Sequence, residues 1–231
     1  MRTAMSPASV PAAVAHGGTV DVAGQGFAAV SRARREAVRA VTDRPRVVHD
    51  ACSTGDATSM SRKVRLFIAT SLDGHIAGPG GSLDWLFADD DYGYDAFIAE
   101  VDTLAMGRKT YEVVKSLGDW PYDAQISWVF TRQERPARDP HVNFTSKSPA
   151  DWLHEIELLP GKDIWVVGGG ELIRDFLDAR LVDEMTIAVH PVVLGGGTPL
   201  FPQGSPRHKL RLAHVHSYPS GLVSSTYMVQ T

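Results

Sequence analysis

The stretches Ser71-Leu72-Asp73-Gly74, Met106-Gly107-Arg108-Lys109-Thr110-Tyr111-Glu112 and Val166-Val167-Gly168-Gly169-Gly170-Glu171-Leu172, in this order, decide the fold. In the second and the third, an apolar run typical of a strand meets small or basic residues at the start of a helical pattern. Backbone N–H groups at a helix N-terminus lack helical partners and carry partial positive charge. Two such helix starts in one domain predict a site for two phosphate groups of one nucleotide.

Strand and helix patterns alternate on both sides of these stretches. Apolar, β-rich runs predict strands over 64–70, 103–106, 127–130, 142–144, 164–167, 184–194, 208–216 and 222–229. Helices are predicted over 92–100 and 109–116, from Ser148 as N-cap with Pro149 at the first position, and over 172–177. Alternation followed by a terminal hairpin predicts an α/β fold whose mixed, mostly parallel central sheet ends in antiparallel C-terminal strands.

The first 62 residues differ sharply in composition from the rest. They contain one aromatic residue, Phe27, and 8 Lys and Arg against 5 Asp and Glu. Such a segment buries too little apolar surface to offset chain entropy, so we expect 1–62 to be mostly disordered. An amphipathic, Arg-rich helix is predicted over 27–41 and would suit a transit peptide or an interaction arm. A second interpretation is that translation begins at Met60 and the extension has no role.

The composition of residues 63–231 argues against several classes of function. Its net charge is −7, which is unlike a nucleic-acid-binding surface. The single cysteine, Cys52, lies outside it, the nine His show no metal-ligand spacing, and no apolar run approaches the ~20 residues that span a bilayer. We expect a cytoplasmic enzyme or binding protein with a small-molecule partner, no bound metal, and no nucleic-acid or membrane partner.

The basic and glycine-rich helix starts each have a local alternative. Arg108 and Lys109 oppose the dipole of the helix they begin, unless an anion binds there, whereas the alternative is a solvated basic turn. The run Gly168-Gly169-Gly170 has neither the G-x-G-x-x-G spacing of a dinucleotide fingerprint nor a P-loop lysine, and tight strand–helix packing would also explain it. We favour anion binding for the first and leave the second open.

Acidic residues near the first stretch are candidates for proton transfer. Asp73 lies in a turn, where Asp commonly hydrogen-bonds its own backbone. Asp84 beside Trp85 is either a carboxylic acid in an apolar wall, with a raised pKa, or the cap of a following helix. His190 precedes Pro191 at the end of an apolar run and is interpreted as a buried structural histidine in preference to a residue facing a pocket.

Together these segments resemble the dihydrofolate reductase-like superfamily, most closely the C-terminal reductase domain of the bifunctional deaminase-reductase of riboflavin biosynthesis. The resemblance spans 63–231 and rests on Ser71 to Ala77, Met106 to Glu112, Val167 to Leu172 and Pro191 to Phe201, which match in order. It implies a three-layer sandwich and an NADPH-dependent reductase. The implied reaction is hydride transfer to a small heterocyclic or phosphoribosylated substrate, similar to 5-amino-6-(5-phosphoribosylamino)uracil reductase.

The resemblance also implies roles for individual residues. Asp73 would act in catalysis and, with Trp85 and Asp84, border the substrate. Backbone at Ala69 and Ile76 would hold the nicotinamide carboxamide, and Thr131 and Arg132 would lie near the 2′-phosphate and favour NADPH over NADH. The remaining cofactor contacts, on the phosphates and the pyrophosphate, would come from Gly107, Arg108, Thr110, Gly168, Gly169, Gly170, Glu171 and Leu172.

Two departures from the family separate this chain from its relatives. No deaminase zinc signature precedes the domain, so the chain resembles a stand-alone reductase. The acid that assists protonation has no single match and could be Asp73, Asp84, Asp91 or Asp95. The alternatives to a reductase are an NADP-binding module without turnover, acting as sensor or subunit, and an interaction protein that uses its basic N-terminal helix. The apolar C-terminal strands would suit a homodimer formed at the sheet edge.

Overall fold

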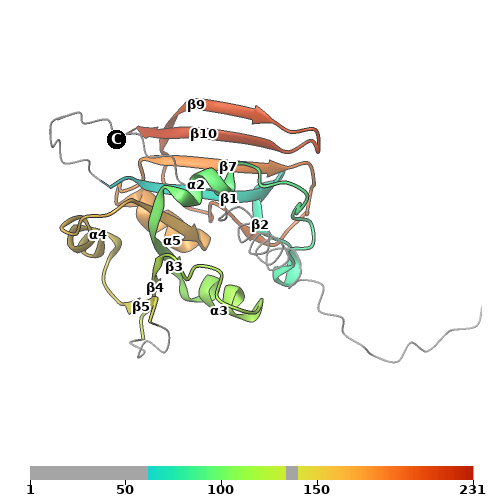
Figure 1. Cartoon of the computed structure of the whole chain (residues 1–231). Coiled ribbons are helices and arrows are strands. Elements are labelled where there is room, and N and C mark those ends of the chain that lie inside the picture. The colour runs from blue at the N-terminus through green and yellow to red at the C-terminus, as the bar shows by residue number, and fades with distance from the viewer. Residues whose placement is uncertain (1–61, 134–139, 231) are drawn as a thin grey trace, which may run out of the picture.

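A computed structural model describes residues 62–133 and 140–230. In this part of the chain an eight-stranded sheet runs through the centre with helices on both faces, as Figure 1 shows. The predicted three-layer α/β sandwich is therefore confirmed. The predictions for residues 1–61, including the helix over 27–41, lie outside the described residues.

The order of strands along the sheet is β5-β4-β3-β6-β1-β7-β10-β9. Every neighbouring pair from β5 to β7 is parallel, and β10 is antiparallel to β7 and β9. The strands are β1 (Val64–Ser71), β2 (His75–Ala77), β3 (Val101–Gly107), β4 (Ile126–Phe130), β5 (Val142–Thr145), β6 (Asp163–Gly168), β7 (Glu184–His190), β8 (Thr198–Pro199), β9 (Lys209–Ser217) and β10 (Val223–Gln230). The helices are η1 (Pro79–Gly81), α2 (Tyr94–Ala99), α3 (Arg108–Ser116), α4 (Pro149–Glu157) and α5 (Gly170–Asp178).

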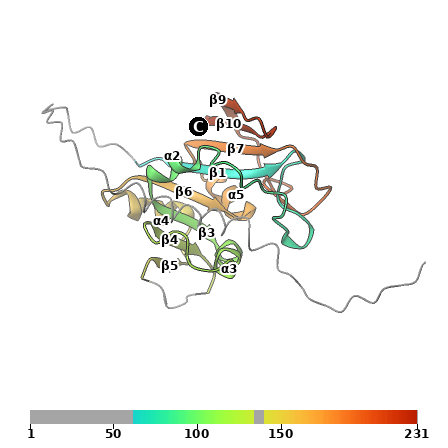
Figure 2. The same cartoon turned by 45° about the vertical axis from the view of Figure 1, so that its right-hand side comes forward.

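Helices cover both faces of the sheet (Figure 2), and an apolar core lies between the sheet and the helices on each face. On one face α4 and α5 contribute Trp152, Phe176 and their neighbours, and on the other α2 and α3 contribute Phe97 and Val114. The helical spacing of apolar residues after Gly170 places one side of α5 in the core. Ser148 caps α4 as predicted, because its hydroxyl accepts a hydrogen bond from the Asp151 N–H at 3.2 Å.

One strand boundary differs from the sequence prediction, and two short strands were not predicted. The strand predicted over 184–194 ends at His190, because Pro191 has no N–H and the next N–H, that of Val192, turns back to the His190 carbonyl at 2.8 Å. The prediction of strands did not include β2 and β8, which pair in a separate antiparallel ribbon. The pairing holds the segment after Gly74 against the segment after Gly197.

The folded domain includes Arg62, one residue before the predicted boundary. Its side chain is buried and donates hydrogen bonds to Asp102, to Thr103 Oγ1 at 2.6 Å and to the carbonyl of Lys162 at 2.7 Å. Burial of a charged side chain requires such partners. Arg62 therefore belongs to the domain rather than to the N-terminal extension.

Within the described residues, helices are too short and too polar to cross a lipid bilayer.

Candidate active site

A cavity of about 1680 Å³ lies along the carboxyl ends of the parallel strands. It extends from Thr131 and Thr145, at the ends of β4 and β5, to Ala188 on β7 and Leu222 before β10. In open α/β sheets this edge is where ligands bind. Small-molecule sites typically occupy about 300–1,000 Å³, so this cavity has room for a cofactor and a second ligand together.

The structure brings all twelve predicted cofactor-binding residues to this one cavity. They reach it from five segments of the chain. The residues are Ala69, Ile76, Gly107, Arg108, Thr110, Thr131, Arg132, Gly168, Gly169, Gly170, Glu171 and Leu172.

The N-terminus of α3 opens directly into the cavity. Gly107 is its N-cap, and no side chain caps the helix, so its first N–H groups keep hydrogen-bonding capacity for a ligand. Arg108 at the first helical position pairs with Glu112 one turn later at 2.7 Å, and both side chains are partly exposed. A guanidinium has five N–H donors, so this pair leaves Arg108 able to bind an anion as well.

The N-terminus of α5 lies beside that of α3. Gly169 is its N-cap, again without a capping side chain, and the Gly169 N–H donates to Thr110 Oγ1 at 3.0 Å. That hydrogen bond ties the two helix starts together. Gly168 has a φ of 133°, which favours glycine. A Cβ at Gly170 would lie 2.8 Å from the Pro199 carbonyl oxygen, so glycine is needed for the approach of the 198–200 segment.

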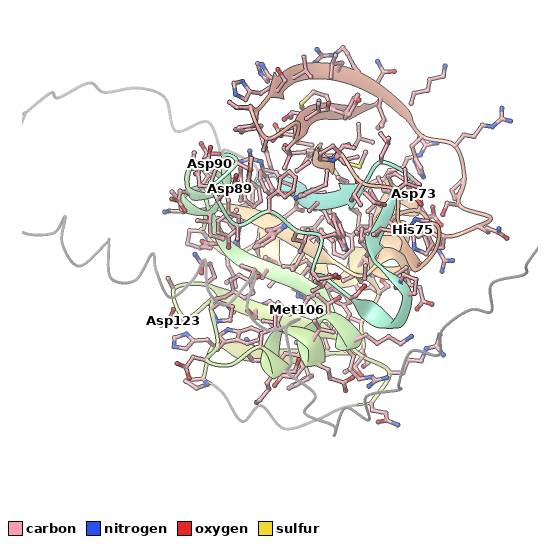
Figure 3. The ribbon with its side chains drawn as sticks, turned by 90° about the vertical axis from the view of Figure 1, so that its right-hand side faces the viewer. Asp73, His75, Asp89, Asp90, Met106 and Asp123 are labelled. Atoms are coloured by element: carbon pink, nitrogen blue, oxygen red, sulfur yellow. The ribbon has the colours of Figure 1, made fainter. Side chains whose placement is uncertain are left out.

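Asp73 lies outside the cavity lining and is held in a tight set of hydrogen bonds. Its carboxylate accepts from Ser71 Oγ at 2.6 Å and from the N–H groups of Leu194 at 3.1 Å and Gly195 at 2.8 Å. His75 Nδ1 is 3.3 Å away, and Figure 3 shows the two side chains together. These hydrogen bonds, that from Ser71 most strongly, hold the pKa of Asp73 well below its usual range. This geometry suits a carboxylate that fixes two loops rather than a proton donor.

Asp84 and Trp85 also lie outside the lining. Asp84 is exposed in a turn over 84–86, so neither the apolar wall nor the following helix that the sequence suggested for it is present. Trp85 donates from Nε1 to the Ser82 carbonyl at 3.2 Å, and its ring packs edge-on against His190 with centroids 5.1 Å apart. Trp85 therefore contacts the site through His190.

His190 is both buried and part of the cavity wall. The Phe87 N–H donates to its Nε2 at 3.3 Å, which leaves the ring proton on Nδ1, 3.3 Å from the Ala188 carbonyl oxygen. Burial lowers the pKa of His190, so the ring is neutral near pH 7. The sequence analysis weighed burial against a pocket position, and the structure gives both.

Sequence reasoning did not identify the aromatic residues that line the cavity. Phe67, Phe87, Tyr92, Tyr94, Tyr122 and Trp165 all line it. They come from five separate segments, and none belongs to a recognisable motif. Of the acids left open, Asp91 lines the cavity and Asp95 does not; Asp90, which the sequence analysis did not consider, lines it too.

Among the residues that the structure describes, no group of three or more His, Cys, Asp or Glu side chains could hold a metal ion.

Comparison with known proteins assigns the domain to a family. Residues 62–224 match the family of the RibD C-terminal domain, and the chain belongs to that family. Its fold is thus the dihydrofolate reductase-like fold that the sequence predicts. Two similar proteins of Bacillus subtilis (strain 168) are described only as uncharacterized. YwjB is 43% identical over 66% of this chain and 90% of its own length, and YyaP is 32% identical over 72% and 94%.

Solved structures agree with this assignment. A protein from Shewanella sp. PV-4 named for riboflavin biosynthesis is 31% identical, with a TM-score of 0.67, over 73% of this chain and 99% of its own. The diaminohydroxyphosphoribosylaminopyrimidine deaminase/5-amino-6-(5-phosphoribosylamino)uracil reductase of Thermotoga maritima shares the fold, with 18% identity and a TM-score of 0.58 over 75% of this chain and 58% of its own.

Proposed function

We propose that this protein is a reductase that transfers hydride from NADPH to a small heterocyclic or phosphoribosylated substrate. One observation carries the proposal. The N-termini of α3 and α5, neither capped by a side chain, open into the same large cavity, which cationic side chains line. Both ends supply unpaired N–H groups for phosphate oxygens, and Arg108 adds a charge-assisted donor. Membership of the RibD C-terminal family supports a reductase role.

The residues at this end fit a dinucleotide. Gly168, Gly169 and Gly170 line the cavity at the start of α5, and the hydrogen bond from the Gly169 N–H to Thr110 Oγ1 holds the two helix starts together. Arg132 and Thr131, after β4, are the proposed contacts of the 2′-phosphate. NADPH would supply the hydride. The protein's part is then to bind the cofactor, orient the acceptor against it and exclude water.

Binding and turnover test this proposal separately. Titration of the full chain should give tighter binding of NADPH than of NADH, and Arg132→Ala should remove most of that difference. Loss of NADPH absorbance with 5-amino-6-(5-phosphoribosylamino)uracil or related heterocycles would establish turnover. Equal affinity for the two cofactors in the unaltered protein would contradict the role given to Arg132.

An NADP-binding module without turnover is the second candidate. Two backbone N–H groups donate to the Asp73 carboxylate, so Asp73 does not serve as a proton donor. This observation favours a module without turnover. This candidate predicts NADPH binding with no oxidation across a broad panel of acceptors. Oxidation with any one of them would exclude it.

A further inference from the structure

Charge is distributed unevenly along the cavity. Its positive side chains are Arg108, Lys109, Arg132, Lys147 and Arg174, which come from α3, α5 and the segments after β4 and β5. Glu171 and Asp175 accompany them on α5. At the β1–β7 end, the only charged residues among the described lining are Asp90 and Asp91, and the nearby His190 is neutral near pH 7. A phosphate group at that end would meet carboxylates and no cation.

Ring contacts and hydrogen bonds fix the segment that carries the acidic residues at the β1–β7 end. Tyr92 has a φ of 52°, an uncommon value for a residue other than glycine, and its ring packs edge-on against Tyr218 at 4.8 Å. Its hydroxyl donates to Asp89 Oδ1 at 2.6 Å and lies 3.1 Å from Ser220 Oγ. The Asp91 carboxylate accepts the N–H of Gly93 at 3.2 Å. Figure 3 shows Asp89 and Asp90 together on the side opposite Asp73. The exposed Asp90 carboxylate accepts the N–H of Asp91 at 2.7 Å, so backbone N–H groups hold both carboxylates that line the cavity.

The wall between these carboxylates and the strand ends is aromatic. Phe67 and Tyr94 contact each other edge-on at 6.1 Å, and Tyr94 contacts Trp165 at 5.8 Å. All three line the cavity. Aromatic walls favour flat rings, and carboxylates accept hydrogen bonds from ring N–H and amino groups.

We infer that the β1–β7 end takes a planar nitrogen heterocycle that is unphosphorylated and either uncharged or cationic. The inference rests on the proposed function, because it assumes that the cofactor occupies the cation-lined end. It narrows the substrate class: the phosphoribosylated pyrimidine named for the Thermotoga maritima enzyme would be a poor ligand here. The chemistry that selects the substrate is the aromatic wall together with the negative charge at Asp90 and Asp91.

A matched pair of ligands tests the inference. The full chain is titrated with 5-amino-6-(5-phosphoribosylamino)uracil and with the same compound lacking its phosphate, each with and without NADPH. We expect the unphosphorylated compound to bind at least about tenfold more tightly. Equal or tighter binding of the phosphorylated compound, or no binding of either, would overturn the inference. Failure of the protein to bind NADPH in a separate titration would instead contradict the proposed function.

Two variants test where the selectivity originates. Asp90→Lys places a cation at the β1–β7 end and should shift the affinity ratio toward the phosphorylated compound by about threefold to tenfold, since the side chain is exposed. Asp123→Lys makes the same charge change at an exposed position outside the lining and should leave the ratio unchanged. Asp91→Asn keeps an acceptor for the Gly93 N–H but loses the one for the Asp95 N–H, and it should shift the affinity ratio in the same direction by a smaller factor. An unchanged ratio in both Asp90→Lys and Asp91→Asn would refute the inference.

Discussion

Arg108 gives the most direct test of phosphate binding at the scale of one residue. Its guanidinium lies at the first position of α3, on the cavity. Replacing it by alanine removes a charge-assisted hydrogen bond, and we expect NADPH affinity to fall by about 1.5–3 kcal/mol, roughly tenfold to a hundredfold. Isothermal titration measures this. Lys115→Ala, on the same helix but outside the cavity, is the control and should bind NADPH normally. An unchanged NADPH affinity in Arg108→Ala would contradict the assignment of Arg108 to a cofactor phosphate.

Gly170 tests the packing at the start of α5, where the helix meets the cavity. A Cβ there would lie 2.8 Å from the Pro199 carbonyl oxygen and 3.0 Å from that of Leu200, both of them backbone atoms. Overpacking of this kind typically costs about 1–3 kcal/mol, so Gly170→Ala should lower the free energy of unfolding by that amount. Urea denaturation checks it against Gly196→Ala, where a Cβ would meet nothing within 4 Å. Equal stability of the two variants would show that the 198–200 segment is not held where the structure has it.

At the scale of elements, Asp73 joins the turn between β1 and β2 to the loop at Leu194 and Gly195. Because its pKa is lowered in the folded state, the carboxylate stabilises the fold above the ordinary pKa of about 3.9, and this contribution is lost as the pH falls below about 4. Unaltered protein should therefore melt at a higher temperature than Asp73→Asn near neutral pH. The difference should narrow as the pH is lowered toward about 3. A difference that stays constant with pH would contradict the proposed clamp.

Element types followed well from the sequence, and the exceptions have physical causes. The two motifs at strand–helix junctions were recognisable because short residues and apolar runs occur there together. The sequence did not predict β2 and β8, because strands of 3 and 2 residues are too short to show an alternation of apolar and polar residues. The sequence predicts too long a strand for β7, because Val192, Val193 and Leu194 are as apolar as the residues before them. The strand nevertheless ends before Pro191, which has no N–H for strand pairing.

At the scale of the molecule, the two ends of the cavity differ in how far the sequence could predict them. The cation-lined end is built from local motifs, so the sequence predicts which residues gather there. The aromatic wall gathers Phe67, Tyr94 and Trp165 from distant segments, and only the fold brings them together. The family resemblance implies that Asp84 and Trp85 border the substrate, but both lie outside the lining because the chain turns at 84–86.

The free edge of the sheet leads us to expect a homodimer. β9 is the last strand, and Leu210, Leu212 and Val215 on it are exposed. An exposed apolar edge strand is a surface that pairs readily with a second copy. Analytical ultracentrifugation should show a dimer that Leu212→Lys dissociates, whereas Leu158→Lys, at an exposed site after α4, should not. A monomer at every concentration would contradict this expectation.

Thermal unfolding of the full chain with NADPH, with NADH and without ligand tests the central claim most directly, that the cavity is an NADPH site. A ligand at a thousand times its dissociation constant adds roughly 4 kcal/mol to the stability of the folded state. We predict a clear rise in melting temperature with NADPH and a smaller one with NADH at the same concentration. A cooperative transition that neither cofactor shifts would contradict the claim.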